Sequence, residues 1–224
     1  MKVENTYSFK GGEEFIKKHY PKELAEVISA ISHVDAISCL TKASSEKTKV
    51  GQLLFSPPDL NDALKNILSS KGWIEKIDGK KGFKEPRISF GKGHFRAMDG
   101  LKNRVGLEIQ FGKYAFVGYD IFSKMVIFNK HGLIDCGIEI IPARNLSRHL
   151  STGGSNLDQV LIELTNRGES DIDIPVYVIS IEPTQEEERE RDRIQKLYSE
   201  DKQETLKILN LKKYKGNLPG PKNF

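Results

Sequence analysis

The chain has 224 residues, a length that suffices for one well-buried domain and is short for two. Its 35 basic and 31 acidic residues give a net charge of +4, which fits a nucleic-acid partner without requiring one. Since no apolar stretch is long enough to cross a membrane and the N-terminus lacks a signal-peptide core, we expect a cytoplasmic protein. Cys39 and Cys136 lie far apart without a CxxC spacing, which predicts buried free thiols and disfavours a zinc site.

The first third of the chain carries two helical patterns. Apolar residues recur at helical spacing over 22–32, and we expect Glu23 and Glu26 of this helix to face solvent. A second helix is expected over 57–70, with Asp59 as a candidate N-cap.

Between these helices, the segment 41–49 is polar and cationic. Its lysines, Lys42, Lys47 and Lys49, fit contacts with nucleic-acid phosphates. For each lysine a solvated surface position is an equal alternative. Further on, the Gly- and Lys-rich stretch 74–93 predicts a hairpin or an irregular connection. Glu75, at its start, could be a further acid near a metal, although a surface position is favoured.

The most informative spacing lies between Asp99 and Gln110. Residues 105–111 alternate loosely and predict a strand with Glu108 and Gln110 on the same face. Burying an ionised glutamate beside an amide is costly unless a cation or a hydrogen-bond network compensates it. The simplest account is a metal site with Asp99 as the second ligand. The alternative is an exposed edge strand carrying Glu108, with Asp99 in a turn.

The second half of the chain alternates helices with strands. A helix over 116–130 is apolar around much of its circumference, and an amphipathic helix is expected over 156–167. Runs of β-branched residues at 136–141 and 175–181 are typical of central strands buried on both faces. This order predicts an α/β fold in which a central mixed sheet is flanked by helices.

The composition changes abruptly after residue 183. The segment 184–224 opens on a run of glutamates and arginines and ends in a Lys-rich tail. We therefore predict one domain over 1–183, followed by a charged, helical extension over 184–224, for which a solvated helix with a frayed end is the favoured form.

Three stretches, in the same order along the chain, resemble Type II restriction endonucleases of the BamHI, BglII and BstYI group, and BstYI most closely. The stretch 104–120, which contains the triplet Glu-Ile-Gln at 108–110, resembles their active-site strand and the helix after it. The other two stretches are 39–57 and 134–155. The resemblance extends from near the N-terminus to residue 182, with a gap over 74–98.

This resemblance implies a restriction-endonuclease-like core of the PD-(D/E)xK superfamily and Mg²⁺-dependent double-strand cleavage of DNA at a short palindrome with a GATC core (RGATCY-like). The implied metal ligands are Asp99, Glu108 and the carbonyl of Ile109. Gln110 stands at the position where many nucleases of the superfamily carry lysine. BglII and BstYI also carry glutamine at this position. Because an amide is no base at neutral pH, Gln110 is expected to orient the attacking water.

Sequence recognition is expected from a lysine and a loop. The resemblance implies that Lys113 and Thr152 lie near the outer base pair of the site. Thr152 belongs to a hydroxyl- and glycine-rich loop with Ser151, Ser155 and Asn156, whose donors and acceptors suit contacts in the major groove. The loop could equally cap the helix after it through Ser155 or Asn156, and both roles can coexist.

Cleavage of both strands of a palindrome calls for two active sites related by a twofold axis, hence a homodimer on double-stranded DNA. The apolar helix over 116–130 is the expected interface, both by its pattern and by resemblance to the helices at the family's dimer contact. Simple burial under the sheet is the alternative. Two rival functions also stay open: a structure-specific or repair nuclease of the same superfamily, and a non-catalytic DNA-binding protein.

Overall fold

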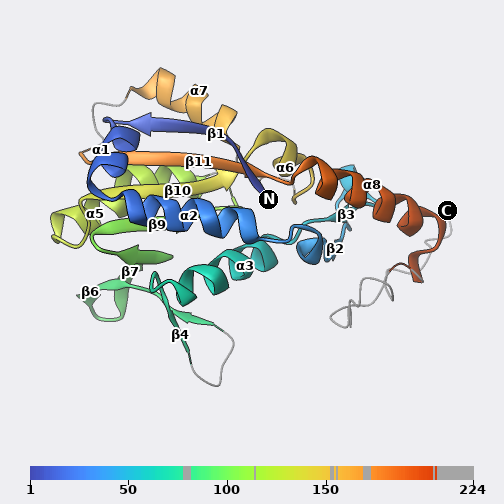
Figure 1. Cartoon of the computed structure of the whole chain (residues 1–224), viewed down its shortest axis with the longest axis horizontal. Helices are drawn as coiled ribbons and strands as arrows, with labels where there is room; N and C mark the ends of the chain where they lie inside the picture. Colours follow the sequence, from blue (N-terminus) through green and yellow to red (C-terminus); the bar gives the residue numbers. More distant parts are fainter. Residues whose placement is uncertain are drawn as a thin grey trace.

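Five strands form the central sheet of the computed structural model, which describes residues 1–77, 82–113, 115–151, 154, 156–168, 173–203 and 205. The strands are β1 (Lys2–Phe9), β8 (Gly100–Lys102), β9 (Val105–Ile109), β10 (Cys136–Pro142) and β11 (Val176–Glu182), in the order β1-β11-β10-β9-β8. The inner pairs β9/β10 and β10/β11 are parallel, whereas β1 and β8 pair antiparallel at the two edges. The predicted mixed sheet is therefore confirmed (Figure 1).

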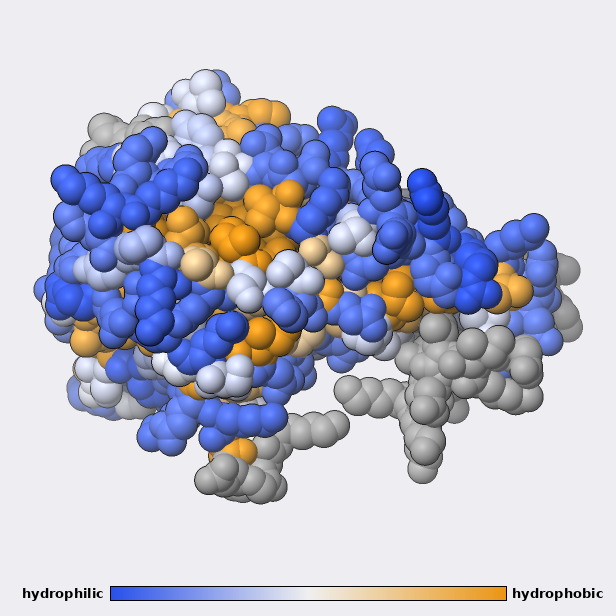
Figure 2. All heavy atoms as spheres, viewed as in Figure 1, coloured by the Kyte–Doolittle hydropathy of each residue, from blue (hydrophilic) through white to orange (hydrophobic). Residues whose placement is uncertain are grey.

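One face of the sheet is covered by the helices α1 (Gly12–His19), α2 (Pro21–His33) and α3 (Pro57–Ser70). The helix α8 (Gln185–Glu200) lies beyond the end of the sheet and packs against η1 (Ile37–Cys39) (Figure 1). Because side chains alternate along a strand, Val105, Leu107 and Ile109 of β9 all enter this core together with the apolar stripes of the helices. On the face of the molecule drawn in Figure 2, hydrophilic side chains predominate, and apolar ones gather over and beside α2.

The opposite face is covered by α4 (Ala115–Tyr119), η3 (Asp120–Lys124), α5 (Met125–Lys130) and α7 (Leu157–Arg167). The first three form the helical stretch expected over 116–130, with a π-helical turn at η3. Much of this apolar stretch is buried under the sheet, and Val126, for example, is only 8% exposed. The apolar side chains that do lie open on these helices are Phe116 and Ile162, at 49% and 63% exposure.

Short elements connect the two layers. They are η1 (Ile37–Cys39), η2 (Lys47–Lys49), α6 (Arg144–Arg148) and three two-stranded hairpins, β2 (Lys42–Ala43) with β3 (Leu53–Leu54), β4 (Glu75–Lys76) with β5 (Phe83–Lys84), and β6 (Arg87–Gly91) with β7 (His94–Ala97). The hairpin expected in 74–93 is thus two successive hairpins, and β7 leads directly to Asp99.

Two local expectations on the first helices are wrong. The N-cap of α3 is Ser56, whose Oγ accepts a hydrogen bond from the backbone N–H of Asp59, while the Asp59 carboxylate accepts one from the Thr41 hydroxyl. On α2, Glu23 is 5% exposed and accepts a hydrogen bond from Asn103. The turn between β8 and β9 meets α2 here and supplies the partner that a helix-only pattern cannot reveal.

Glu26, one turn further along α2, is also partnered and does not face solvent. Its carboxylate accepts hydrogen bonds from Lys102 of β8 and from the indole N–H of Trp73, the latter at 2.9 Å. The backbone carbonyl of Trp73 in turn accepts a hydrogen bond from Leu101. Trp73 thus links α2, the end of α3 and the edge strand β8.

The helix α8 begins with a capping box between Thr184 and Glu187 and buries Ile194 and Tyr198 in the first core. The division into a domain over 1–183 and an extension over 184–224 stays a prediction, and most of the Lys-rich tail lies outside the described residues. Cys39 and Cys136 are buried free thiols, as predicted. Within the described ranges, no helix has the length and apolar character to cross a membrane.

Candidate active site

Asp99 sits between β7 and the edge strand β8, next to β9. One of its carboxylate oxygens, Oδ2, accepts a hydrogen bond of 2.8 Å from the backbone N–H of Ile109. This bond joins the turn before β8 to the end of β9, where Glu108 and Gln110 lie. The structure therefore brings Asp99 to the segment that carries the other two predicted metal ligands, Glu108 and Ile109, and the predicted water-orienting residue Gln110.

Glu108 is buried on β9, which has a neighbour on each side. Only 3% of its surface is exposed, so the alternative of an exposed edge strand is wrong. Since Leu107 and Ile109 enter the first core, Glu108 and Gln110 face the α4–η3–α5 layer. Gln110 accepts a hydrogen bond from the backbone N–H of Gly112 at 2.9 Å, and its side chain opposes the rise that burial causes in the pKa of Asp120.

Lys124, which the sequence analysis missed, compensates the charge of Glu108. Its Nζ lies 3.0 Å from Oε1 of Glu108 and 2.6 Å from Oδ1 of Asp120. Burial raises the pKa of Glu108 well above its ordinary value, the charge of Asp99 adds to this, and Lys124 opposes it. Burial also opposes the charge on Lys124, but Glu108 and Asp120 outweigh that effect and its pKa is raised.

Glu139 is a second acid in this layer that the sequence analysis missed. It lies on β10 in register with Glu108, is fully buried, and neither of its carboxylate oxygens has a hydrogen-bond partner. Burial raises its pKa well above the ordinary value, and the charges of Asp120 and Glu108 raise it further. The available signal was one acid inside an apolar strand that runs parallel to the strand of Glu108.

Lys65 of α3 compensates Asp99 from the other side of the site. Its Nζ lies 2.6 Å from Oδ1 of Asp99 and 2.8 Å from Oε1 of Glu85. Burial opposes the charge on Lys65, but Asp99 and Glu85 outweigh it, so the pKa of Lys65 is raised. Two lysines thus compensate the charge of Asp99 and Glu108, and each lysine forms ion pairs with two acids.

The residues present fit a hydrated Mg²⁺ better than a metal enclosed by protein ligands. In the part of the chain that the structure describes, no three Asp, Glu, His or Cys side chains converge closely enough to hold a metal by themselves. Mg²⁺ keeps several waters and needs only one or two carboxylates. Asp99 and Glu108 would supply these. Oε1 of Glu108 is buried without accepting a hydrogen bond, despite its ion pair with Lys124.

The predicted recognition residues lie around one loop. The backbone of Lys113, an exposed residue, forms an antiparallel bridge with Gly154, and Lys42 donates a hydrogen bond to the Ser151 hydroxyl. Asn156 is the N-cap of α7, with its Oδ1 accepting from the N–H of Gln159 at 3.2 Å. The other two predicted loop residues, Thr152 and Ser155, lie outside the described residues.

The lysines at 47 and 49 differ in their surroundings. Lys47 is exposed on η2. Lys49 donates hydrogen bonds to the carbonyls of Arg148, at 2.8 Å, and Leu150, and burial lowers its pKa. Its ammonium therefore holds the end of α6 next to the loop 151–156, whereas the Lys47 side chain is exposed.

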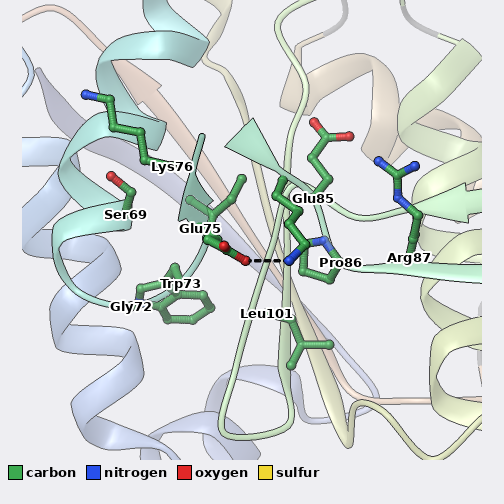
Figure 3. A pocket seen from close by; sticks show the side chains of 11 residues that line it. Ser69, Gly72, Trp73, Glu75, Lys76, Glu85, Pro86, Arg87 and Leu101 are labelled. Atoms are coloured by element: carbon green, nitrogen blue, oxygen red, sulfur yellow. Dashed lines mark ion pairs between the residues drawn. The ribbon is translucent and has the colours of Figure 1, made fainter. Parts of the chain in front are cut away.

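A surface pocket of about 1010 Å³ lies beside the site, between the end of α3 and the β4/β5 hairpin (Figure 3). Glu75 borders it and forms an ion pair of 2.9 Å with Lys84, in which both side chains are about two-thirds exposed. The favoured surface position of Glu75 is confirmed. Glu85, which also lines the pocket, contacts the site through Lys65.

Comparison with known proteins gives a family and a fold. A family model described as restriction endonuclease BglII/BglIII matches residues 5–181, which include every residue of the site. The crystal structure of restriction endonuclease BglII complexed with a DNA 16-mer is similar, with a TM-score of 0.63 and 21% identity over 83% of this chain and 80% of that chain. No curated protein matches the sequence significantly.

The burial of Glu139 predicts an effect on stability that depends on pH. A carboxyl whose pKa is raised in the folded protein binds its proton more tightly there than in the unfolded chain, so the free energy of unfolding falls as the pH rises above the ordinary pKa of 4.5. Glu139→Gln removes this loss. In EDTA, urea unfolding should show the variant more stable than wild type at pH 8, with the difference shrinking toward pH 4. Glu75→Gln, at the surface, should show little change; an equal gain at both pH values for Glu139→Gln would contradict the argument.

Proposed function

This chain belongs to the restriction endonuclease BglII/BglIII family and is a Type II site-specific deoxyribonuclease, and we propose that it cuts both strands of DNA at a short palindrome with Mg²⁺ as cofactor. The observation that supports the proposal is the hydrogen bond from the N–H of Ile109 to Asp99, since it holds the Asp99 carboxylate at the residue that Glu108 and Gln110 flank. The proposal also includes a GATC core in the recognition site, membership of the PD-(D/E)xK superfamily with BstYI as the most similar enzyme, and a cytoplasmic location.

The proposed chemistry divides among few residues. Asp99, Glu108 and the carbonyl of Ile109 would hold Mg²⁺, which supplies positive charge for the developing phosphorane and lowers the pKa of bound water. Gln110 orients the attacking water through its carbonyl oxygen, which keeps a second lone pair beside the bond from Gly112. Lys65 and Lys124 keep the acids paired before the cation enters.

DNA recognition is proposed at Lys113 and the loop 151–156. What supports it is the bridge between Lys113 and Gly154, which joins the strand end after the catalytic residues to the loop. Only the short segment of chain between Gln110 and Lys113 would then separate the residues that contact bases from those that carry out hydrolysis. Lys42 and Lys47 would contact phosphates, and Lys49 would act on the same surface by holding the chain at 148–150.

A homodimer is proposed because cleavage of a palindrome needs two sites. The support comes from Phe116 on α4 and Ile162 on α7, large apolar side chains that lie open on the helical layer. Exposed apolar residues on helices that cover the same face of the sheet suit a twofold contact between helices.

We expect Asp99→Ala and Glu108→Ala to abolish cleavage while DNA binding without divalent metal persists or tightens, since each variant removes a metal ligand and a negative charge near the phosphates. Plasmid digestion and gel-shift assays measure the two properties, and Glu75→Ala is the matched control on a surface acid. Cleavage at the wild-type rate by either site variant would refute the proposed metal site. Discrete fragments from the wild type support a restriction enzyme, whereas random ones indicate a nuclease without a defined palindrome.

Lys113→Ala and Lys47→Ala should weaken DNA binding in different ways. Loss of a base contact costs about 1–3 kcal/mol at one position of the site, whereas loss of a phosphate contact weakens all sequences alike and lowers the salt slope by about one. Binding to oligonucleotides that vary in the flanking bases, at several salt concentrations, separates these outcomes. If Lys113→Ala weakens binding to all sequences alike, Lys113 contacts the DNA backbone and not a base.

The wild-type protein should sediment as a dimer at micromolar concentration, and Phe116→Glu or Ile162→Glu should shift it toward the monomer mass of 25.3 kDa. Both side chains are open, so the charged variants should still fold, which circular dichroism checks. Double-strand cleavage should fall with the dimer. A wild type that stays monomeric both free and on DNA would rule out the proposed assembly.

A further inference from the structure

Lys124 reaches Glu108 from an unusual place in the helical layer. It ends the π-helical turn η3, and its side chain is 15% exposed. π-Helical turns are rare and recur at functional sites, because the inserted residue changes which side chains share a face of the helix. Here the turn sets the ammonium between Glu108 and Asp120, at 3.0 and 2.6 Å. The Tyr119 ring lies below it, with its centroid 5.9 Å from Nζ.

The charges around Lys124 are unbalanced. Glu108, Asp120 and Glu139 face the same layer, and Lys124 is the cation that pairs with the first two. Among the ion pairs between described residues, none other involves Glu108. Neither Oε1 of Glu108 nor the oxygens of Glu139 accept a hydrogen bond. The orientation of the Glu108 carboxylate therefore depends on attraction to Lys124 against repulsion by the other acids.

We propose that Lys124 is a positioning residue of the nuclease site: it holds the Glu108 carboxylate in place for the divalent cation, while Asp120 fixes the ammonium from the other side. This inference rests on the proposed function of Glu108 as a metal ligand. Groups that orient a metal ligand in this way contribute about 10- to 100-fold to metal affinity or activity.

The test compares three variants. Lys124→Met keeps the length of the side chain without its charge, Lys124→Arg keeps the charge, and Lys130→Met removes an exposed lysine of the neighbouring helix α5. For Lys124→Met we expect the Mg²⁺ concentration for half-maximal cleavage to rise by about 10- to 100-fold. DNA binding in EDTA should persist. Lys124→Arg should recover part of the loss, and Lys130→Met should behave as wild type.

A second readout does not depend on cleavage. A cation that binds only the folded protein stabilises it by RT ln(1 + c/Kd), where c is the Mg²⁺ concentration, so melting curves recorded over a range of Mg²⁺ concentrations yield the affinity. Lys124→Met should need about 10- to 100-fold more Mg²⁺ for the same shift in melting temperature. An unshifted Mg²⁺ dependence in both readouts would overturn the positioning role.

A purely structural role is tested with the double variant Lys124→Met/Glu139→Gln. Removing one buried acid offsets the lost ammonium and should restore the melting temperature in EDTA, even if Lys124→Met alone folds poorly. The requirement for more Mg²⁺ should persist, because Glu108 still lacks its partner. If Glu139→Gln restores the Mg²⁺ dependence as well, Lys124 serves only the charge balance of the fold and the inference is wrong. A wild type that never cleaves DNA in Mg²⁺ would instead refute the proposed function.

Discussion

The parallel pairing of β9 with β10 places two glutamates in register inside the molecule, and much of the site follows from that juxtaposition. Glu108 and Glu139 point into a layer covered by helices, where an uncompensated charge is costly. Two strands with only apolar side chains would be buried here at a lower cost in free energy. The chain keeps both acids, pairs Glu108 with Lys124 and leaves Glu139 without a hydrogen-bond partner. Such an arrangement favours chemistry over stability and is typical of active sites.

The compensation comes from both sides of the sheet. Lys65 arrives from α3 in the first layer and Lys124 from η3 in the second, and each bridges a proposed metal ligand to another acid. The two carboxylates are thus held by different helical layers and joined through the N–H of Ile109. A change in either layer can therefore reach the spacing of the proposed metal ligands without altering β9 itself.

The sequence predicted those parts of the site that follow from a single strand. The period of two places Glu108 and Gln110 on one face, and the mixed sheet follows from the alternation of helices and strands. Lys65 could not be found in this way, since a lysine in an amphipathic helix reads as a solvent-facing residue until its partner across the sheet is known. The prediction that Glu23 faces solvent was wrong for the same reason. The position of Lys124 depends in addition on a π-helical turn, which has no recognisable sequence signal.

Trp73 gives this architecture an optical consequence. It is the single tryptophan of the chain, 1% exposed, with its indole bonded to Glu26 and its carbonyl bonded to the strand that follows Asp99. Its fluorescence therefore arises from one place, the junction of α2, α3 and the edge strand. Changes in emission report on that junction without a label, so separation of the helical layer from the sheet edge can be timed against events on bound DNA.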